Sequence, residues 1–526
     1  MPSSLESRST GTFNSITRKG RPSVEITLDG DVSSQSRGIN TYTTLDPIEG
    51  KVVISADTDV RFDQIHISFI GAARTLIERP GYAGPTVGQS SAFHAFLRLT
   101  QPIEESQYPQ PRVLEAGRKY SFPFTFVVPE RLLPHACKHE VNHPQIQAAH
   151  THLPPSLGGH TLAGRGGSKL LDDMCPQMCQ IQYKIRARVA RFDLPEDQPP
   201  KTLVEVVRKV RIVPATDEEP PLDVADSNEE FRMRSEKIVK KGTLRKKFGR
   251  IAVAAAQPKP FRLPSVHSES SENVSPATMA TLHVRFDPDH EHQTPPKLGC
   301  LWTKLKVNTF FGIEPWSDFP SRSSKLAWNY NKGVYTDTLC LASRCVASAT
   351  WQKHTTSAPP SPSSCSSSRR SSIQSNWTDG SLVGPTACFT GNTYYTATVL
   401  VPISLPSHKA YAPTFHSCLI SRTYSLDISL SYNPSSSSTF TTRQTISLCI
   451  PVQVTGQESL TAVVANRARE ASAQSAAADE FFTPRVITPP SPEYVGQARL
   501  EGMSMLSGST ASAPPEYLSL LTTSAH

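Results

Sequence analysis

Hydrophobic residues alternate with polar ones along the first half of the chain. Residues 65–69 place Ile, Ile and Phe at every second position, and residues 120–128 carry aromatic side chains at the same spacing. Residues 181–189 alternate apolar with polar or basic side chains, and residues 204–213 close the series. A period of two puts successive side chains on opposite faces of a strand, so we expect half-buried β-strands here. No long helical period interrupts them.

A second alternating series begins near Lys237 and runs to about Val454. Its clearest member is a strictly alternating set of apolar side chains: Tyr424, Leu426, Ile428, Leu430 and Tyr432. Two such series, with no intervening helical pattern, are typical of antiparallel sandwiches. The sequence therefore predicts an all-β protein with two tandem immunoglobulin-like β-sandwich domains.

Changes in composition divide the chain further. An acidic stretch with a Pro-Pro pair separates the two series, and a run rich in Ser and Pro interrupts the second one. Such a run cannot bury enough apolar surface to fold, so we expect a surface loop open to phosphorylation. The predicted segments are a disordered 1–22, a first sandwich 23–214, a linker 215–234, a second sandwich 235–456 with a disordered insertion 355–385, and a disordered tail 457–526.

Composition narrows the cellular setting. Hydrophobic residues make up 37% of the chain, and no apolar run is long enough for a membrane-spanning helix. The N-terminus lacks the apolar centre of a signal peptide, and ten cysteines are scattered without a disulfide framework. We therefore expect reduced thiols and a cytoplasmic location. A net charge of +8 over 526 residues permits attraction to an anionic membrane surface and does not indicate a nucleic-acid partner.

Near the C-terminus stands Pro514-Pro515-Glu516-Tyr517. Adjacent prolines favour the polyproline II conformation, which loses little entropy on docking into an aromatic groove. The tyrosine two positions later supplies a second anchor. Pro-Pro-x-Tyr is the ligand pattern of WW domains. The chain contains 45 prolines, so a proline-rich tail without this role is the alternative.

Several stretches of the first series, and two of the second, resemble arrestin domains. Those in the first series are Tyr42, 47–52, 65–73, 114–124, 153–158 and 181–185, and the looser ones in the second are 305–307 and 396–402. Together with the Pro-Pro-x-Tyr tail, they make the chain similar to the α-arrestins, in particular to the fungal arrestin-related trafficking adaptors.

This resemblance implies an adaptor. The sandwiches would recognise cytosolic segments of membrane transporters or receptors, and Pro514, Pro515 and Tyr517 would recruit a HECT-type ubiquitin ligase through its WW domains. Cargo ubiquitination and endocytosis would follow at the plasma membrane or endosomal membranes. Pro492 and Tyr494 would at best form a second, weaker site, since Ser491 replaces a proline of the pattern. The alternative is an arrestin-like signalling or vesicle-sorting scaffold that recruits no ligase.

A loop rich in histidine suggests metal binding. Residues 135–143 contain three His and one Cys, His150 and His152 follow, and Cys175 and Cys179 offer further thiols. Imidazole and thiolate suit zinc, but no Cys-x-x-Cys pair is present. We therefore expect a solvated interstrand loop, no metal site and no cofactor, with a zinc-dependent enzyme as the competing hypothesis.

The densest basic cluster precedes a predicted strand. Its members include Lys240, Lys241, Lys246, Lys247 and Arg250. One interpretation is a charged edge that discourages strand pairing. The functional alternative is contact with anionic lipid or an acidic partner, where each cation near a membrane contributes about 1 kcal/mol. Lys184, Arg186, Arg188 and Arg191 form a second basic stripe, which we expect on the exposed face of a strand.

Three common enzyme motifs are missing from the sequence. There is no Gly-x-Ser-x-Gly elbow, no P-loop and no dinucleotide-binding fingerprint. Residues 139–143 read His-Glu-x-x-His, but they lie in the predicted loop and not on the helix that the zinc-protease motif requires. The sequence thus predicts a non-enzymatic protein, and it does not name the cargo or the surface that binds it.

Overall fold

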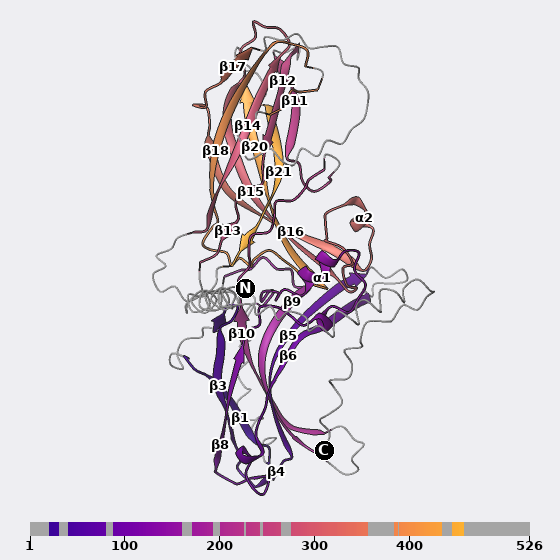
Figure 1. Ribbon diagram of the computed structural model, residues 1–526, viewed down its shortest axis with the longest axis vertical. Coiled ribbons are helices and arrows are strands. Elements are labelled where there is room, and N and C mark those ends of the chain that lie inside the picture. The colour runs from indigo at the N-terminus through magenta and orange to yellow at the C-terminus, as the bar shows by residue number, and fades with distance from the viewer. Residues whose placement is uncertain are drawn as a thin grey trace, which may run out of the picture. The chain divides into compact units, whose positions relative to one another are not determined.

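The computed structural model describes two β-sandwiches (Figure 1). The residues it describes are 20–30, 40–79, 88–159, 171–192, 200–225, 228–241, 246–264, 275–355, 383–387, 389–433 and 444–456. The chain divides into two compact units, Met1–Val464 and Ala465–His526. Both sandwiches belong to the first of these units, and the second unit lies outside the described residues.

The first sandwich contains a three-stranded and a five-stranded sheet. The smaller sheet has the order β1-β3-β8, and the larger β2-β10-β9-β5-β6, with β2 and β10 parallel and the other pairs antiparallel. The strands are β1 (Ser23–Leu28), β2 (Thr41–Tyr42), β3 (Pro47–Ser55), β5 (Gln64–Arg79), β6 (Gly88–Gln101), β8 (Lys119–Val127), β9 (Cys179–Arg191) and β10 (Lys201–Ile212). A small ladder, β4 (Val60–Arg61) with β7 (Val113–Leu114), completes it.

The alternation in sequence accounts for the core between these sheets. Along β8 every second residue is buried, and these are Tyr120, Phe122, Phe124 and Phe126. Facing them from β9, Ile181, Tyr183 and Ile185 are fully buried. The rings interlock, because Phe69 of β5 lies 6.0 Å from Phe126 and 5.8 Å from Tyr183 between centroids.

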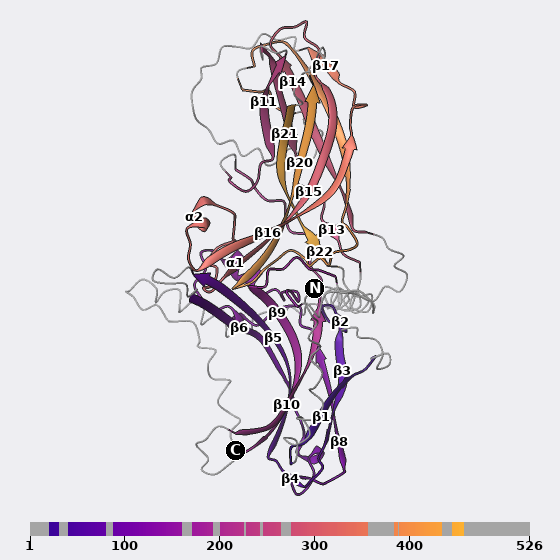
Figure 2. The same ribbon diagram turned by 180° about the vertical axis from the view of Figure 1, so that it is seen from behind.

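The second sandwich also pairs two larger sheets (Figure 2). One has the order β11-β12-β14-β18-β17, and the other β16-β15-β20-β19 with β21 also paired to β20. The strands are β11 (Arg234–Lys241), β12 (Lys246–Ala255), β14 (Ala277–Pro288), β15 (Lys297–Gly312), β16 (Lys332–Cys345), β17 (Gln352–Thr355), β18 (Thr393–Ser404), β19 (Phe415–His416), β20 (Ile420–Asn433) and β21 (Gln444–Val452). A short parallel pair, β13 (Phe261–Arg262) with β22 (Val454–Thr455), completes it. The alternating residues of β20, from Tyr424 to Tyr432, are all buried in its core.

Helices are few and short where the structure describes the chain. They are η1 (Glu105–Gln107), η2 (Pro134–Ala136), α1 (Pro144–His150) and α2 (Ser324–Ala327). None of them is long and apolar enough to cross a membrane. The predicted all-β class with two sandwiches is confirmed. The predicted segment boundaries stay a prediction, except at the insertion.

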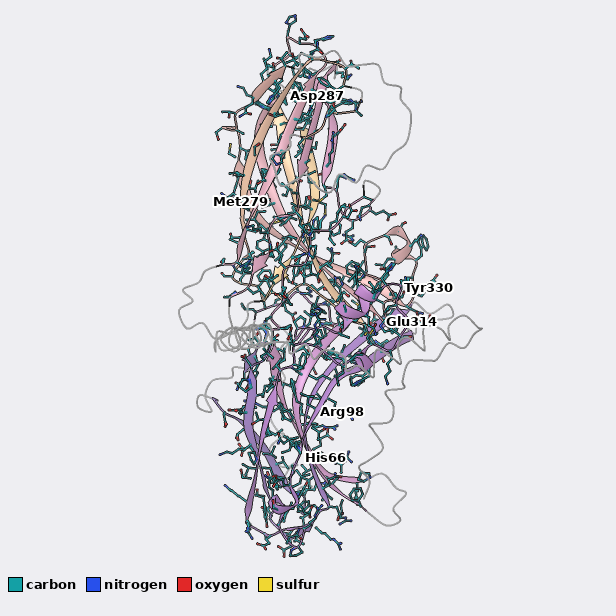
Figure 3. The ribbon with its side chains drawn as sticks, in the orientation of Figure 1. His66, Arg98, Met279, Asp287, Glu314 and Tyr330 are labelled. Carbon is teal, nitrogen blue, oxygen red and sulfur yellow. The ribbon has the colours of Figure 1, made fainter. Side chains whose placement is uncertain are left out.

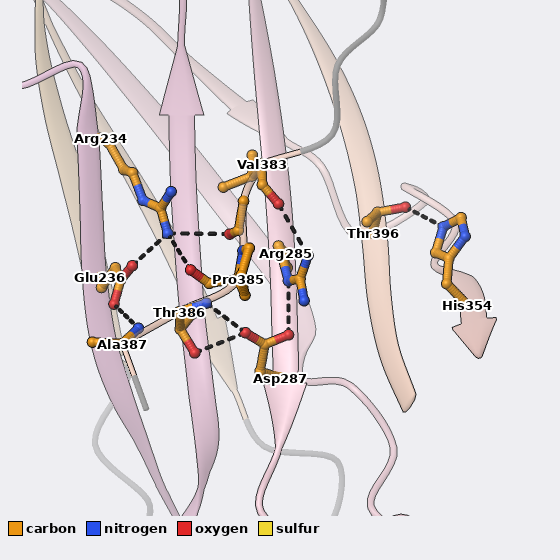
Figure 4. Close-up of polar contacts among 11 residues, drawn as sticks. Arg234, Glu236, Arg285, Asp287, His354, Val383, Pro385, Thr386, Ala387 and Thr396 are labelled. Carbon is orange, nitrogen blue, oxygen red and sulfur yellow. Dashed lines mark hydrogen bonds and ion pairs between the residues drawn. The ribbon is translucent and has the colours of Figure 1, made fainter. Parts of the chain in front are cut away.

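Both ends of the predicted insertion 355–385 are ordered, which corrects that boundary. Thr355 is the last residue of β17 and pairs with Thr393. At the other end, Val383 is buried and its carbonyl oxygen accepts a hydrogen bond from Arg285 (Figure 4). Arg285 also forms a buried ion pair with Asp287 at 2.8 Å. A buried carboxylate needs several donors, and Asp287 recruits the amide and hydroxyl of Thr386 to supply them.

The predicted linker is hydrogen-bonded to the end of the second sandwich. The Glu219 amide donates to Gln453 Oε1 at 3.0 Å, and Gln453 Nε2 donates back to the Glu219 carbonyl. Thr216 and Gly456 exchange a similar pair, at 3.2 and 2.9 Å. The chain thus enters the second sandwich and leaves it at neighbouring points.

Candidate functional site

The residues predicted to bind WW domains cannot be placed. Pro514, Pro515 and Tyr517, and the weaker pair Pro492 and Tyr494, all lie outside the described residues. Their role therefore rests on the sequence alone.

The structure places the predicted basic cluster on the β11–β12 hairpin. Lys240 lies opposite Lys247, and Lys241 opposite Lys246, in the register of the two strands, while Arg250 follows on β12. The order of the sheet makes β11 an edge strand. The lysines therefore share one hairpin at a sheet edge, although Lys247 also pairs with Asp289 at 2.6 Å.

The second basic stripe lies on the outer face of the five-stranded sheet. Lys184, Arg186 and Arg188 of β9 are half-buried and alternate with fully buried residues. Two further side chains of neighbouring strands, His66 of β5 and Arg98 of β6, are labelled in Figure 3. His66 lies opposite Arg188. Burial, and then the positive charges of Arg188 and Arg186, lower the pKa of His66. This stripe is less exposed than the sequence suggested.

A buried arginine joins the two sandwiches. Arg422 of β20 has no exposed surface, and its guanidinium donates to the carbonyl oxygens of Asp173 at 2.6 Å and Met174 at 3.2 Å. It also donates to the hydroxyl of Thr309 at 2.8 Å. Residues 173 and 174 precede β9 of the first sandwich, whereas Arg422 and Thr309 belong to the second. Buried carbonyl oxygens need hydrogen-bond donors, and the Arg422 guanidinium supplies them. Its hydrogen bonds therefore link the first sandwich to the second.

Two other contacts flank this arginine. Lys409 forms an ion pair with Asp172 at 2.6 Å, which lowers the pKa of that carboxyl group, chiefly through the hydrogen bond. The Thr75 hydroxyl of β5 donates to the carbonyl of Gly312 at the end of β15, at 2.7 Å. Apolar side chains of the second sandwich, among them Phe311 and Ile420, belong to the core of the first. The junction is therefore both apolar and hydrogen-bonded.

The histidine-rich loop is also part of this junction, and the expectation of a solvated loop is corrected for its buried side chains. Cys137 and His150 are only 4% and 2% exposed. Cys137 caps η2, and His150 is the last residue of α1. The backbone amide of Asn142 donates to the carbonyl of Ser317, which lies between β15 and β16, at 2.9 Å. Packing against the second sandwich, which local sequence does not reveal, buries Cys137 and His150, whereas His135, Lys138 and His143 are exposed.

Four side chains of this region converge on one point. They are Cys137, His139, His150 and Cys418, and their candidate ligand atoms all lie within 4.8 Å of one another. The Cys137 sulfur lies 3.3 Å from His139 Nε2 and 3.6 Å from His150 Nδ1. Cys418 comes from the turn between β19 and β20, in the second sandwich. Two thiols and two imidazoles are a donor set suited to a divalent transition metal.

Burial governs the protonation of this cluster. It lowers the pKa of His150 to about 3, with smaller contributions from His139, His416 and His94, so the ring is neutral near pH 7. Burial, and then neighbouring Cys137, raise the pKa of Cys418 to about 12. A neutral imidazole keeps a lone pair for a ligand.

Sequence reasoning found only part of this cluster. It singled out Cys137, His139 and His150, but it proposed Cys175 and Cys179 as the additional thiols. Those two belong to a different place, where the Cys175 sulfur lies 3.4 Å from the carbonyl oxygen of Cys179. Cys418 was missed, because no spacing rule connects it with a loop so distant in the chain. Its position between a two-residue strand and a long one gives no signal of its own.

Comparison with known proteins addresses the first sandwich. Residues 32–213 match the family model described as "Arrestin (or S-antigen), N-terminal domain", over about a third of the chain. No curated protein matches the chain. Arrestin-family proteins are generally non-enzymatic adaptors. Residues 32–213 are thus similar to an arrestin N-terminal domain, which supports an adaptor or trafficking role in general.

Proposed function

We propose that this protein is an adaptor that links membrane transporters or receptors to a HECT-type ubiquitin ligase with WW domains. Ligase recruitment would promote ubiquitination and endocytosis of the bound cargo. The observation that carries the proposal is the combination, in one chain, of an arrestin N-terminal domain match and Pro514-Pro515-Glu516-Tyr517. The first supports cargo recognition, and the second supports recruitment of the ligase.

Physical chemistry favours the tail motif as the ligase contact. Pro514 and Pro515 restrict the backbone before binding, so little entropy is lost in the WW groove. Tyr517 adds a large aromatic anchor with few rotatable bonds, a residue type that often dominates binding energy. The weaker Pro492 and Tyr494 would raise the effective concentration of the tail at a ligase with several WW domains.

The basic surfaces suggest where an acidic partner would bind. The β11–β12 hairpin presents the backbone pairs Lys240–Lys247 and Lys241–Lys246 at a sheet edge, followed by Arg250. An anionic membrane or an acidic cargo segment would be attracted to such an edge. The adaptor would then act in the cytoplasm and at the plasma membrane or endosomal membranes.

The decisive experiment measures binding of purified WW domains to the full-length protein. Tyr517→Ala removes the aromatic anchor, which we expect to cost about 2 kcal/mol, or roughly 30-fold in Kd. Tyr494→Ala is the matched control, with an expected loss below about three-fold. Equal affinities of wild type and Tyr517→Ala would refute ligase recruitment through this motif. If cargo turnover in cells were also unchanged in Tyr517→Ala, the protein would instead be a scaffold that recruits no ligase.

A further inference from the structure

We propose that Cys137, His139, His150 and Cys418 form a structural zinc site that fastens the second sandwich to the first. The four candidate ligand atoms lie within 4.8 Å of one another, and three of the four side chains come from one loop of the first sandwich. The site is independent of the proposed adaptor function, so each can fail without the other.

The distances from the Cys137 sulfur to the two imidazoles match a tetrahedral ion. Zinc bonds of about 2.3 Å to sulfur and about 2.05 Å to nitrogen place sulfur and nitrogen ligands roughly 3.5 Å apart. The Cys137 sulfur lies 3.3 Å from His139 Nε2 and 3.6 Å from His150 Nδ1. These side chains therefore need little rearrangement to bind one ion.

The hydrogen bonding of His139 orients its ring for this role. Its Nδ1 lies 3.0 Å from the carbonyl oxygen of Glu140, which can only accept. In the neutral ring Nδ1 must then carry the proton, which leaves the lone pair on Nε2, the atom that faces Cys137. A backbone carbonyl on the far nitrogen is the usual outer partner of a zinc-binding histidine. His139 is also only half-buried, so an ion can reach the four ligand atoms from solvent past this side chain.

Ordinary hydrogen bonding accounts poorly for the buried members. His150 Nδ1 has only the Cys137 sulfur at 3.6 Å, and its buried Nε2 has no hydrogen-bond partner among the described residues, so no good hydrogen bond holds this ring. The Cys418 sulfur has only a long contact, 3.7 Å, with the carbonyl oxygen of Ala136. Thiols are weak donors and acceptors, so burying two of them beside two imidazoles gains little without a metal.

The ligands come from both sandwiches, which indicates a structural and not a catalytic ion. All four positions are filled by protein side chains, which is typical of structural zinc and leaves no open position for catalysis. Cys418 lies in the β19–β20 turn, and its carbonyl oxygen accepts from the amide of Trp316, on the β15–β16 connection, at 2.9 Å. Zinc would therefore tie the loop of the first sandwich to two connections of the second.

The test is the metal content of the full-length protein purified without chelators, measured by elemental mass spectrometry. We expect about one zinc per chain, and a fall below about 0.2 in Cys418→Ser. Cys340→Ser is the matched control, because Cys340 is an exposed free thiol outside the cluster. If Cys418→Ser does not fold, His139→Gln replaces it, since that ligand is half-exposed. Its zinc affinity should fall by more than the 10- to 100-fold that an outer hydrogen-bond partner contributes.

Replacement of zinc by cobalt(II) identifies the ligands directly. Wild-type protein should show the visible bands of tetrahedral cobalt and a near-ultraviolet thiolate-to-cobalt transition, with that transition weakened in Cys418→Ser. The proposal is wrong if wild type contains no zinc and gives no thiolate transition with cobalt, or if both variants keep full zinc. A disulfide between Cys137 and Cys418, found by mass spectrometry of the native protein, would also overturn it.

Discussion

Replacing Arg422 with Met tests how the two sandwiches are joined. Arg422 makes three hydrogen bonds, two of them to carbonyl oxygens of the segment that precedes β9. Methionine has a similar length and no donor. The substitution therefore leaves the carbonyls of Asp173 and Met174 buried without their partner, while the apolar packing changes little.

The expected cost follows from opposing contributions. Hydrogen bonds from a charged donor contribute about 1.5–3 kcal/mol each. Against their loss, the variant no longer buries a guanidinium group, whose desolvation costs several kcal/mol. Contributions of neighbouring bonds are also not additive. We expect the junction to weaken by about 3 kcal/mol. Lys409→Met removes an ion pair between the same two segments, but Asp172 is 61% exposed, so its loss should cost less than about 1 kcal/mol.

Hydrogen exchange measured by mass spectrometry separates these outcomes, since a protein with two sandwiches need not unfold in one step. The amides of Gly158 and Cys175 are bound to the Asp173 carboxylate beside the junction and report its opening. A loss of 3 kcal/mol would speed their exchange by about 100-fold, against less than about five-fold in Lys409→Met. Equal effects of the two variants would refute the assignment of the buried arginine as the main polar link.

Two further predictions concern charge. The depressed pKa of Asp172 means that its pair with Lys409 stabilises the protein above the ordinary pKa of an aspartate, and that this contribution is lost as the pH falls through the folded-state pKa. The stability difference between wild type and Lys409→Met, measured by urea denaturation, should therefore shrink toward zero in acid; a constant difference would contradict it. On vesicles containing anionic lipid, Lys240→Gln/Lys247→Gln should bind up to about 30-fold more weakly, at about 1 kcal/mol per cation. The control Lys51→Gln/Lys119→Gln, on β3 and β8, should bind like wild type, and equal binding of both doubles would exclude the hairpin as the lipid contact.

Strands were the most predictable part of this fold. In β8 the alternation of apolar and polar residues is strict, because one face of the strand meets a core and the other does not. In β20 the residues from Tyr424 to Tyr432 alternate as well, although Ser425 and Ser431 on the other face are also buried. Sequence also located the first-domain resemblance, which the arrestin match over residues 32–213 supports. Such features depend on neighbours in sequence, and they can be read within a window of a few residues.

Contacts between distant segments were not predictable. Arg422 falls on the apolar face of β20, two residues before Tyr424, and only the arrival of residues 173 and 174 explains its burial. Cys418 likewise becomes part of a cluster only through its contact with a loop of the other sandwich. The end of the Ser/Pro-rich insertion was misjudged for the same reason, since Val383 is fixed by Arg285 and not by its own neighbours.

The hydrogen bonds between Thr216 and Gly456 have a mechanical consequence. A ligase that pulls on the tail while the first sandwich is held by cargo would apply force between these two residues, which already lie side by side. The load would fall on this pair and on the short β13–β22 ladder beside it. The long β20–β21 ladder would lie outside the line of tension. The second sandwich could thus remain intact while the tail is under traction.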